Sequence, residues 1–244
     1  MYTDSVKLLS TQQTSQFDTE YVNQALFEKI APHFIRQQKD RGFNLLDVGG
    51  GNGTYSDRVI NHNTGTQVTL LEPDSYLLSR NKAHPRKNIV SGTYQERYFS
   101  PKFDAIQFNW VLHHFITGNY QQTTALQAAS LRKAYTELKP GGRIIILENF
   151  YDGFLTNDLP SRIIFELTSM TSIKRFIKKA GANTAGVGVC FHSRKQWLDM
   201  VRAAGFRVIC DEECYDYSEL SWLKRVLLTI GRQYVGLIVA EKEV

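Results

Sequence analysis

Cysteine is scarce in this sequence, and long apolar runs are absent. The 244 residues include three cysteines, Cys190, Cys210 and Cys214. Cys210 and Cys214 have no second pair that would complete a zinc site, so we expect reduced cysteines, no bound metal and a cytoplasmic location. No run is long enough to span a bilayer, and residues 1–16 lack the apolar core of a signal peptide, so we expect no membrane partner.

Neither sign of charge dominates the composition. Lysine and arginine number 29 and the acidic residues 24, which leaves a formal charge of +5 that permits an acidic partner without requiring one. Hydrophobic residues make up 42% of the chain, which is ordinary for a globular protein, and no low-complexity tract interrupts it. The length suits one α/β domain with an appended or inserted element.

A strand, a turn rich in glycine and a helix follow one another between residues 44 and 60. The apolar run Asn44–Val48 predicts a buried strand, and residues 54–60 are compatible with a helix that Thr54 or Ser56 would cap. Glycine allows a tight turn and lets a ligand approach the backbone. The N-terminus of the helix presents free N–H groups and a positive dipole end. The segment therefore predicts a site for a nucleotide-like ligand.

The turn carries the pattern Asp-x-Gly-x-Gly-x-Gly. Its members are Asp47, Gly49, Gly51 and Gly53, with Gly50 among them. The pattern differs from the Gly-x-Gly-x-x-Gly of dinucleotide enzymes, and it lacks the Gly-Lys-Ser/Thr ending of a triphosphate loop. A carboxylate two residues before the first glycine suits a ligand with a cationic end.

Strands and helices alternate along the rest of the chain. Further strands are predicted at 67–71, 88–90, 104–109, 143–148, 206–210 and 233–240, and helices at 17–38 (with a break at Pro32), 120–138, 163–177, 193–204 and 218–231. Alternation of this kind predicts a parallel, doubly wound sheet. Ligands of such sheets bind beyond the carboxyl ends of the strands.

The segment Leu46–Gly53 resembles the first motif of the class I S-adenosylmethionine-dependent methyltransferases. Three more landmarks follow in the order and spacing of that family: Glu72, Ser91–Tyr94 and Phe108–Phe115. The resemblance implies an α/β fold with a doubly wound, seven-stranded, mostly parallel sheet (Rossmann-like methyltransferase fold), whose last strand runs antiparallel. It also implies the cofactor S-adenosyl-L-methionine.

The same resemblance divides the chain into four parts. We expect an N-terminal helical cap (1–42), a cofactor-binding core (43–149), a helical lid inserted after strand five (150–192) and the C-terminal part of the core sheet (193–244).

The resemblance also assigns the residues that bind the cofactor. They are Asp47, Gly49, Gly50, Gly51, Gly53, Glu72, Pro73, Thr93, Tyr94, Asn109 and Trp110. A carboxylate at Glu72 can accept hydrogen bonds from both ribose hydroxyls. Thr93 stands where many members of the family have an acidic residue that meets the adenine, so we expect its hydroxyl and the Tyr94 ring to serve instead. Asn109 is expected to face the methionine end of the cofactor.

Three histidines are candidate general bases. His113 and His114 follow the fourth strand, and His192 follows the predicted lid. A histidine side chain is well suited to take up a proton near neutral pH, although one of these residues could instead hold the local turn. The candidates for contact with the substrate are Phe17, Tyr21, Glu148, Asn149 and Tyr151.

Three functions stay open at this point. The first is methylation of a small-molecule acceptor at oxygen, nitrogen or carbon, in specialised metabolism. The second is methylation of RNA (tRNA) or protein, which is motivated by the basic cluster Lys174, Arg175, Lys178 and Lys179; a solvated helix end explains that cluster as well. The third is a non-catalytic cofactor-binding or partner protein, with a homodimer interface on the apolar faces of 163–177 and 222–230.

The cofactor assignment predicts the behaviour of two variants. Gly51→Arg places a long side chain where a ligand should approach, and Glu72→Ala removes an acceptor for the ribose hydroxyls. Loss of such charge-assisted hydrogen bonds costs about 1.5–3 kcal/mol, so S-adenosylmethionine should bind roughly tenfold or more weakly in calorimetry. Unchanged affinity in both variants would remove the assignment.

Overall fold

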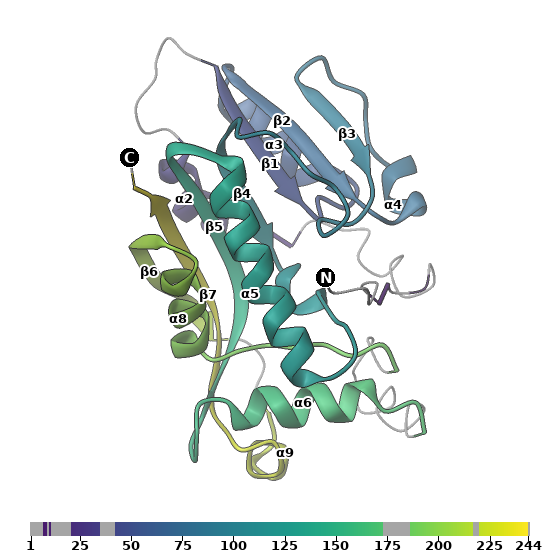
Figure 1. Cartoon of the computed structure of the whole chain (residues 1–244), viewed down its shortest axis with the longest axis vertical. Coiled ribbons are helices and arrows are strands. Elements are labelled where there is room, and N and C mark those ends of the chain that lie inside the picture. The colour runs from purple at the N-terminus through teal and green to yellow at the C-terminus, as the bar shows by residue number, and fades with distance from the viewer. Residues whose placement is uncertain are drawn as a thin grey trace.

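The computed structural model describes residues 7–8, 10, 21–34, 42–172, 186–216 and 220–243 (Figure 1). The strands are β1 (Phe43–Val48), β2 (Thr66–Glu72), β3 (Lys87–Ser91), β4 (Phe103–Asn109), β5 (Leu138–Gly153), β6 (Phe206–Asp216) and β7 (Ile230–Lys242). The helices are α2 (Gln24–Ile30), α3 (Thr54–His62), α4 (Ser75–Ser79), α5 (Tyr120–Glu137), α6 (Leu159–Ser169), α8 (Arg194–Ala203) and α9 (Trp222–Leu227), with 3₁₀ turns η2 (Ala31–His33) and η3 (Leu112–His114).

The strands form one seven-stranded sheet in the order β3-β2-β1-β4-β5-β7-β6. Strands β1 to β5 pair in parallel, and β7 lies antiparallel between β5 and β6. The doubly wound, mostly parallel sheet and its antiparallel last strand are therefore confirmed. The order reverses between β1 and β4, which opens a crevice at their carboxyl ends.

Helices cover both faces of the sheet, so its central strands are buried on both sides. Along β1, Leu45 packs into the cluster beneath α2 and α3, whereas Leu46 packs into the cluster beneath α5 and α8. Figure 1 shows α5 across the face nearer the viewer and α2 and α3 behind the sheet. This double burial explains why β1 reads as a continuous apolar run rather than an alternating one.

The start of α3 differs from the sequence prediction. Its N-cap is Gly53, in the left-handed region at φ +80°, and neither Thr54 nor Ser56 caps the helix. Asn52 Oδ1 accepts hydrogen bonds from the backbone N–H and the hydroxyl of Thr54. The Ser56 hydroxyl turns inward and donates to Asp47 Oδ2 at 2.7 Å, because a buried carboxylate needs a donor.

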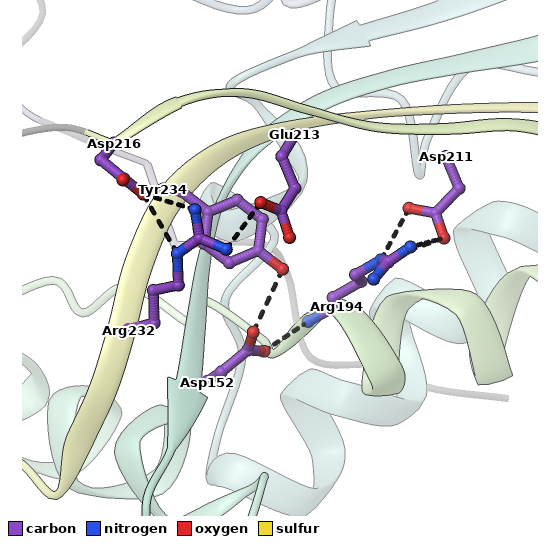
Figure 2. Close-up of polar contacts among 7 residues, drawn as sticks. All are labelled: Asp152, Arg194, Asp211, Glu213, Asp216, Arg232 and Tyr234. Atoms are coloured by element: carbon purple, nitrogen blue, oxygen red, sulfur yellow. Dashed lines mark hydrogen bonds and ion pairs between the residues drawn. The ribbon is translucent and has the colours of Figure 1, made fainter.

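Strands β5 and β6 run further than predicted. Expected to end at residues 148 and 210, they continue to Gly153 and Asp216 because β7 pairs with both along its length. Figure 2 shows the polar network on this extension, formed by Asp152, Arg194, Asp211, Glu213, Asp216, Arg232 and Tyr234. The Asp152 carboxylate accepts from the Tyr234 hydroxyl and from the Arg194 backbone N–H, both at 3.1 Å. The network ties the three strands to the start of α8.

The predicted helices are present but shorter at several ends. Helix α2 and turn η2 occupy part of the 17–38 stripe, and Pro32 lies where the α-helix gives way to the 3₁₀ turn. Helix α6 ends at Ser169, and the basic cluster predicted at 174–179 lies outside the described residues. The lid assigned to 150–192 therefore stays a prediction. None of the helices described here is both long and apolar enough to cross a bilayer.

Candidate active site

A cavity of about 600 Å³ opens at the carboxyl ends of β1, β2, β4 and β5. That volume lies in the usual range for small-molecule and cofactor sites. Among the predicted cofactor residues, those that line it are Asp47, Gly49, Gly50, Gly51, Glu72, Pro73, Thr93, Tyr94, Asn109 and Trp110. Among the predicted catalytic and substrate residues, those that line it are Tyr21, His113, His114 and Asn149.

The glycine turn after β1 forms one wall of the cavity, and larger residues would not fit at two of its positions. Gly49 has φ +69°, and a Cβ there would lie 2.5 Å from Val111 Cγ2. A Cβ on Gly50 would lie 2.5 Å from Leu70 Cγ. Gly51 has φ +55°, yet a Cβ there would meet nothing within 4 Å, so its open side is available to a ligand. Two glycines thus let the turn pack closely, and the third leaves space beside the backbone.

Two buried carboxylates flank this turn. Glu72 Oε2 accepts from the Gly51 backbone N–H at 3.1 Å, and its Oε1 accepts from the Asp74 backbone N–H at 2.9 Å. Glu72 therefore joins the turn after β1 to the turn after β2. Asp47 is 2% exposed and is held by the Ser56 hydroxyl.

Burial shifts the protonation of both acids. Desolvation raises the pKa of Glu72 to about 7, against the lowering effect of its two backbone hydrogen bonds. Desolvation likewise raises the pKa of Asp47 to about 6, although the Ser56 hydroxyl and Lys87 favour the ionised form. Each acid is thus readily able to change its charge when a cation or a set of hydroxyl donors enters the cavity.

The wall after β3 is made by Thr93 and Tyr94. The Thr93 hydroxyl donates to Glu96 Oε2 at 2.8 Å. The Tyr94 ring is buried beside Phe115, and its hydroxyl donates to Glu137 Oε2 at 2.8 Å. These contacts fix the ring that sequence reasoning expected beside the adenine.

The end of β4 is strained and tightly held. Trp110 has φ +47°, which is uncommon for a bulky residue and is typical of functional sites. Its indole N–H donates to Asn149 Oδ1 at 2.9 Å, across to the end of β5. Asn109 Oδ1 accepts from the Gln107 amide at 2.7 Å. The two asparagines are therefore oriented by partners on the sheet.

A histidine and a glutamate form a buried pair next to this strand end. His113 Nδ1 lies 2.8 Å from Glu148 Oε2, and Glu148 is fully buried on β5. The carboxylate requires the proton of a neutral imidazole to be on Nδ1, which leaves Nε2 as the nitrogen that can accept a proton. Phe191 stacks on the His113 ring at 4.4 Å. Glu148, predicted to face the substrate, thus acts behind His113 and does not line the cavity.

His114 borders the same cavity, but its environment disfavours the protonated ring. Burial, together with the neighbouring His113, lowers the pKa of His114 well below its ordinary value. Since the two rings lie 4.1 Å apart, a charge on one disfavours a charge on the other.

Besides Glu148, four predicted residues are placed elsewhere or lie outside the described residues. His192 is fully buried away from the cavity, and desolvation lowers its pKa to about 4. Tyr151 packs its ring against Phe191 at 5.0 Å and does not line the cavity. Gly53 caps α3 and lies behind the cavity-lining glycines. Phe17 lies outside the described residues.

Several lining residues were not predicted. They are Lys7, Leu8, Val22, Tyr55, Val111, Tyr215 and Val235, among others. Tyr215 reaches the cavity because β6 extends beyond its predicted end, where Tyr215 pairs with Val235 of β7. The contact of these two residues depends on the strand register, which sequence periodicity does not give.

The residues present fit S-adenosylmethionine. The cofactor carries a cationic sulfonium and ammonium group and a ribose with two hydroxyls. The cavity offers the Asp47 and Glu72 carboxylates, the open side of Gly51 and the held side chain of Asn109. In the part of the chain that the structure describes, no three histidine, cysteine or acidic residues gather as metal ligands would.

The chain is similar in sequence to known methyltransferases. A sequence model of the family described as "Methyltransferase domain" matches residues 19–211. The chain is 26% identical over 188 residues to the ubiquinone/menaquinone biosynthesis C-methyltransferase UbiE of Rhizobium rhizogenes, covering 70% of this chain and 67% of that protein. It is 27% identical over 174 residues to the inositol 4-methyltransferase of Mesembryanthemum crystallinum, covering 65% of this chain and 44% of that protein.

A solved structure shows the same fold. The S-adenosylmethionine-dependent methyltransferase of Mesorhizobium loti superposes with a TM-score of 0.58 at 16% identity, covering 89% of this chain and 97% of that one. Fold, site and family match define a class I S-adenosylmethionine-dependent enzyme. The chain belongs to the methyltransferase-domain family.

The raised pKa of Glu72 predicts a pH dependence of stability. The folded protein binds the proton of Glu72 more tightly than the unfolded chain, so the free energy of unfolding should fall as pH rises from about 4.5 to about 7. The shift corresponds to about 3 kcal/mol. Glu72→Gln removes this contribution and should make the fall shallower, as measured by chemical denaturation between pH 5 and 8; the smaller fall due to Asp47, which ends near pH 6, should stay in both proteins.

The exposed Glu166 provides the control for this comparison. Glu166→Gln should keep the wild-type slope. If Glu72→Gln and the wild type lose stability in parallel over this range, the assignment of a proton-binding Glu72 fails.

Proposed function

We propose that this enzyme methylates a hydroxyl group of a small-molecule acceptor, with His113 as the general base. The buried pair of His113 and Glu148 beside the cavity carries the proposal. A hydroxyl acceptor must lose its proton as the new bond to carbon forms. A neutral imidazole held by a buried carboxylate is suited to take that proton.

The roles of the individual residues follow from their contacts. Glu148 orients the His113 ring and stabilises the charge that the ring acquires when it accepts a proton. Glu72 and the open side of Gly51 bind the nucleoside part of the cofactor, and Asp47 favours its cationic end. Trp110 and Asn149, which hold each other, position the acceptor near the end of β4.

When bound, S-adenosylmethionine supplies a methyl group already activated by the sulfonium charge. The protein's task is therefore alignment and proton removal. Orientation of two reactants can supply roughly 7–11 kcal/mol of rate enhancement. The rigid strand end at Trp110, with its left-handed backbone, is the kind of fixed element that such alignment requires.

The small-molecule class is supported by the cavity and by the relatives. The lining includes the aromatic side chains Tyr21, Trp110 and Tyr215, which suit an enclosed, apolar acceptor. The relatives are named for quinone biosynthesis and for inositol. We favour a small-molecule acceptor in specialised metabolism over RNA or protein, because aromatic side chains line the cavity and the relatives are named for small molecules.

The base assignment predicts the effect of His113→Gln. Loss of general base catalysis should lower kcat by about 10²–10⁴-fold and leave the Kd for S-adenosylmethionine unchanged, because the nucleoside is held by other residues. The enzyme is incubated with radiolabelled S-adenosylmethionine and size-fractionated cell extract, and the labelled small-molecule fraction then serves as acceptor for the variants.

His62, an exposed histidine on α3, gives the matched control. His62→Gln should turn over like the wild type. Label confined to RNA or protein, or full turnover by His113→Gln, would contradict the proposal.

We also propose that the enzyme works as a homodimer in the cytoplasm. Helix α9 exposes Trp222, Leu223, Val226 and Leu227, with exposed fractions of 52–75%. Phe154 and Leu155 are exposed as well, and the Phe154 backbone N–H donates to Thr229 just beyond α9. Apolar patches of this kind commonly bind another protein surface. The three cysteines are unpaired, which suits a reducing compartment.

The dimer proposal predicts the sedimentation of one variant. Leu227→Asp places a charge on this apolar patch and should convert the wild-type dimer to a monomer in sedimentation velocity. Tyr98→Asp alters another exposed residue, beyond β3 at the opposite edge of the sheet, and should leave the dimer intact. A wild-type monomer at micromolar concentration would remove the proposal.

A further inference from the structure

A short strap of residues, 189–193, runs alongside the turn that carries His113. The Cys190 backbone N–H donates to the His113 carbonyl at 3.0 Å. Phe191 stacks its ring on the His113 imidazole, with 26° between the two planes. The strap therefore touches His113 at both its backbone and its side chain.

One buried amide on α5 holds the strap and the turn together. Gln127 Nε2 donates to the Leu112 carbonyl at 3.0 Å and to the Cys190 carbonyl at 2.9 Å. These carbonyls belong to the residues immediately before His113 and immediately before Phe191. Both donor protons of the amide are thus used, and they fix the spacing between the two chain segments.

The orientation of that amide is set by His192. His192 Nε2 lies 2.7 Å from Gln127 Oε1, and both side chains are fully buried. An amide oxygen only accepts, so His192 carries its proton on Nε2. Its pKa of about 4, lowered by burial, keeps the ring neutral in the physiological range. On the other side of the ring, Nδ1 lies 3.3 Å from the Ser161 hydroxyl of α6.

We propose that Gln127 and His192 are positioning residues for the His113 base, acting through the strap. The inference rests on the proposed function. The sequence suggested His192 as a candidate base, but in this proposal it does not contact the acceptor. It orients the Gln127 amide, which holds the backbone before His113 next to the backbone before Phe191. Loss of these hydrogen bonds would let the His113 ring rotate out of its hydrogen bond with Glu148.

The geometry explains why these contacts use polar groups in a buried place. The Leu112 carbonyl lies in the turn η3 and already accepts from the Phe115 backbone N–H at 3.0 Å, whereas Cys190 lies in the strap, outside the described helices and strands. A buried carbonyl outside regular structure needs a donor, and the Gln127 amide supplies one to Cys190 while it donates a second bond to Leu112. The Gln127 oxygen is itself paired with His192. The result is a satisfied network with a single geometry.

The test compares the wild type with a set of variants, using the acceptor fraction identified above. Gln127→Met keeps the side-chain length and removes both donors. It should lower kcat on the order of 10²-fold, the effect of a small misplacement, with the acceptor KM and the cofactor Kd nearly unchanged. Gln121→Met, at an exposed position on the same helix, should behave as the wild type.

The double variant separates positioning from general damage. In a His113→Gln background, Gln127→Met should cause no further loss of kcat, because the base that it positions is already absent. An added loss equal to that of Gln127→Met alone would overturn the proposal. If instead His113→Gln alone has no effect, the proposed function fails, and the positioning role fails with it.

A second variant serves if Gln127→Met does not fold. Phe191→Leu removes the ring from His113 and leaves the buried hydrogen bonds in place. It should lower kcat in the same direction and again have no effect in the His113→Gln background. Nitrogen-15 spectra of the histidines give a readout without turnover: the His113 Nδ1 proton should be observed in the wild type and in Gln121→Met and should be lost to exchange in Phe191→Leu. Wild-type kcat and spectra in Phe191→Leu would overturn the proposal.

Discussion

The carboxylate of Glu72 joins the two turns on which the cofactor side of this enzyme depends. It accepts one backbone N–H from the turn after β1 and another from the turn after β2. Because β1 and β2 are parallel neighbours, their carboxyl ends meet at one edge, and a short acidic side chain can bridge them. The glycines then determine how closely the turn approaches a ligand. Their left-handed backbone angles are possible there without a Cβ penalty.

The acceptor side of the cavity is formed at the carboxyl ends of β4 and β5, which are also parallel neighbours. β4 ends at Asn109 and β5 passes beside it, so Trp110 meets Asn149 and His113 meets Glu148 across the same edge of the sheet. Each contact joins a residue that lines the cavity to one that orients it. The orienting residues Glu148 and Asn149 thus stand on β5, whereas Trp110 and His113 lie on the less regular segment that follows β4.

Much of this could be predicted from the sequence, and the rest could not for a physical reason. Apolar runs and turn glycines identify the strands, and their alternation with helices indicates a doubly wound sheet, because these are local patterns. Glu72 and His113, which the sequence places at or after strand ends, line the cavity. Tyr215 in the cavity wall and the contact between Gln127 and His192 were missed, since each depends on packing between segments far apart in the chain. The α3 cap at Gly53 is local, but it was missed because the prediction looked for a side-chain cap at Thr54 or Ser56.

The proposed function requires one nucleoside to bind against the turn at Gly51 and the carboxylate of Glu72. A crystal structure of the enzyme with S-adenosylhomocysteine would show where that nucleoside lies. We expect the ribose hydroxyls within hydrogen-bond distance of Glu72 and the sulfur facing the side of the cavity that His113 lines. A nucleoside bound outside this cavity, or one whose ribose has no contact with Glu72, would contradict the proposed function.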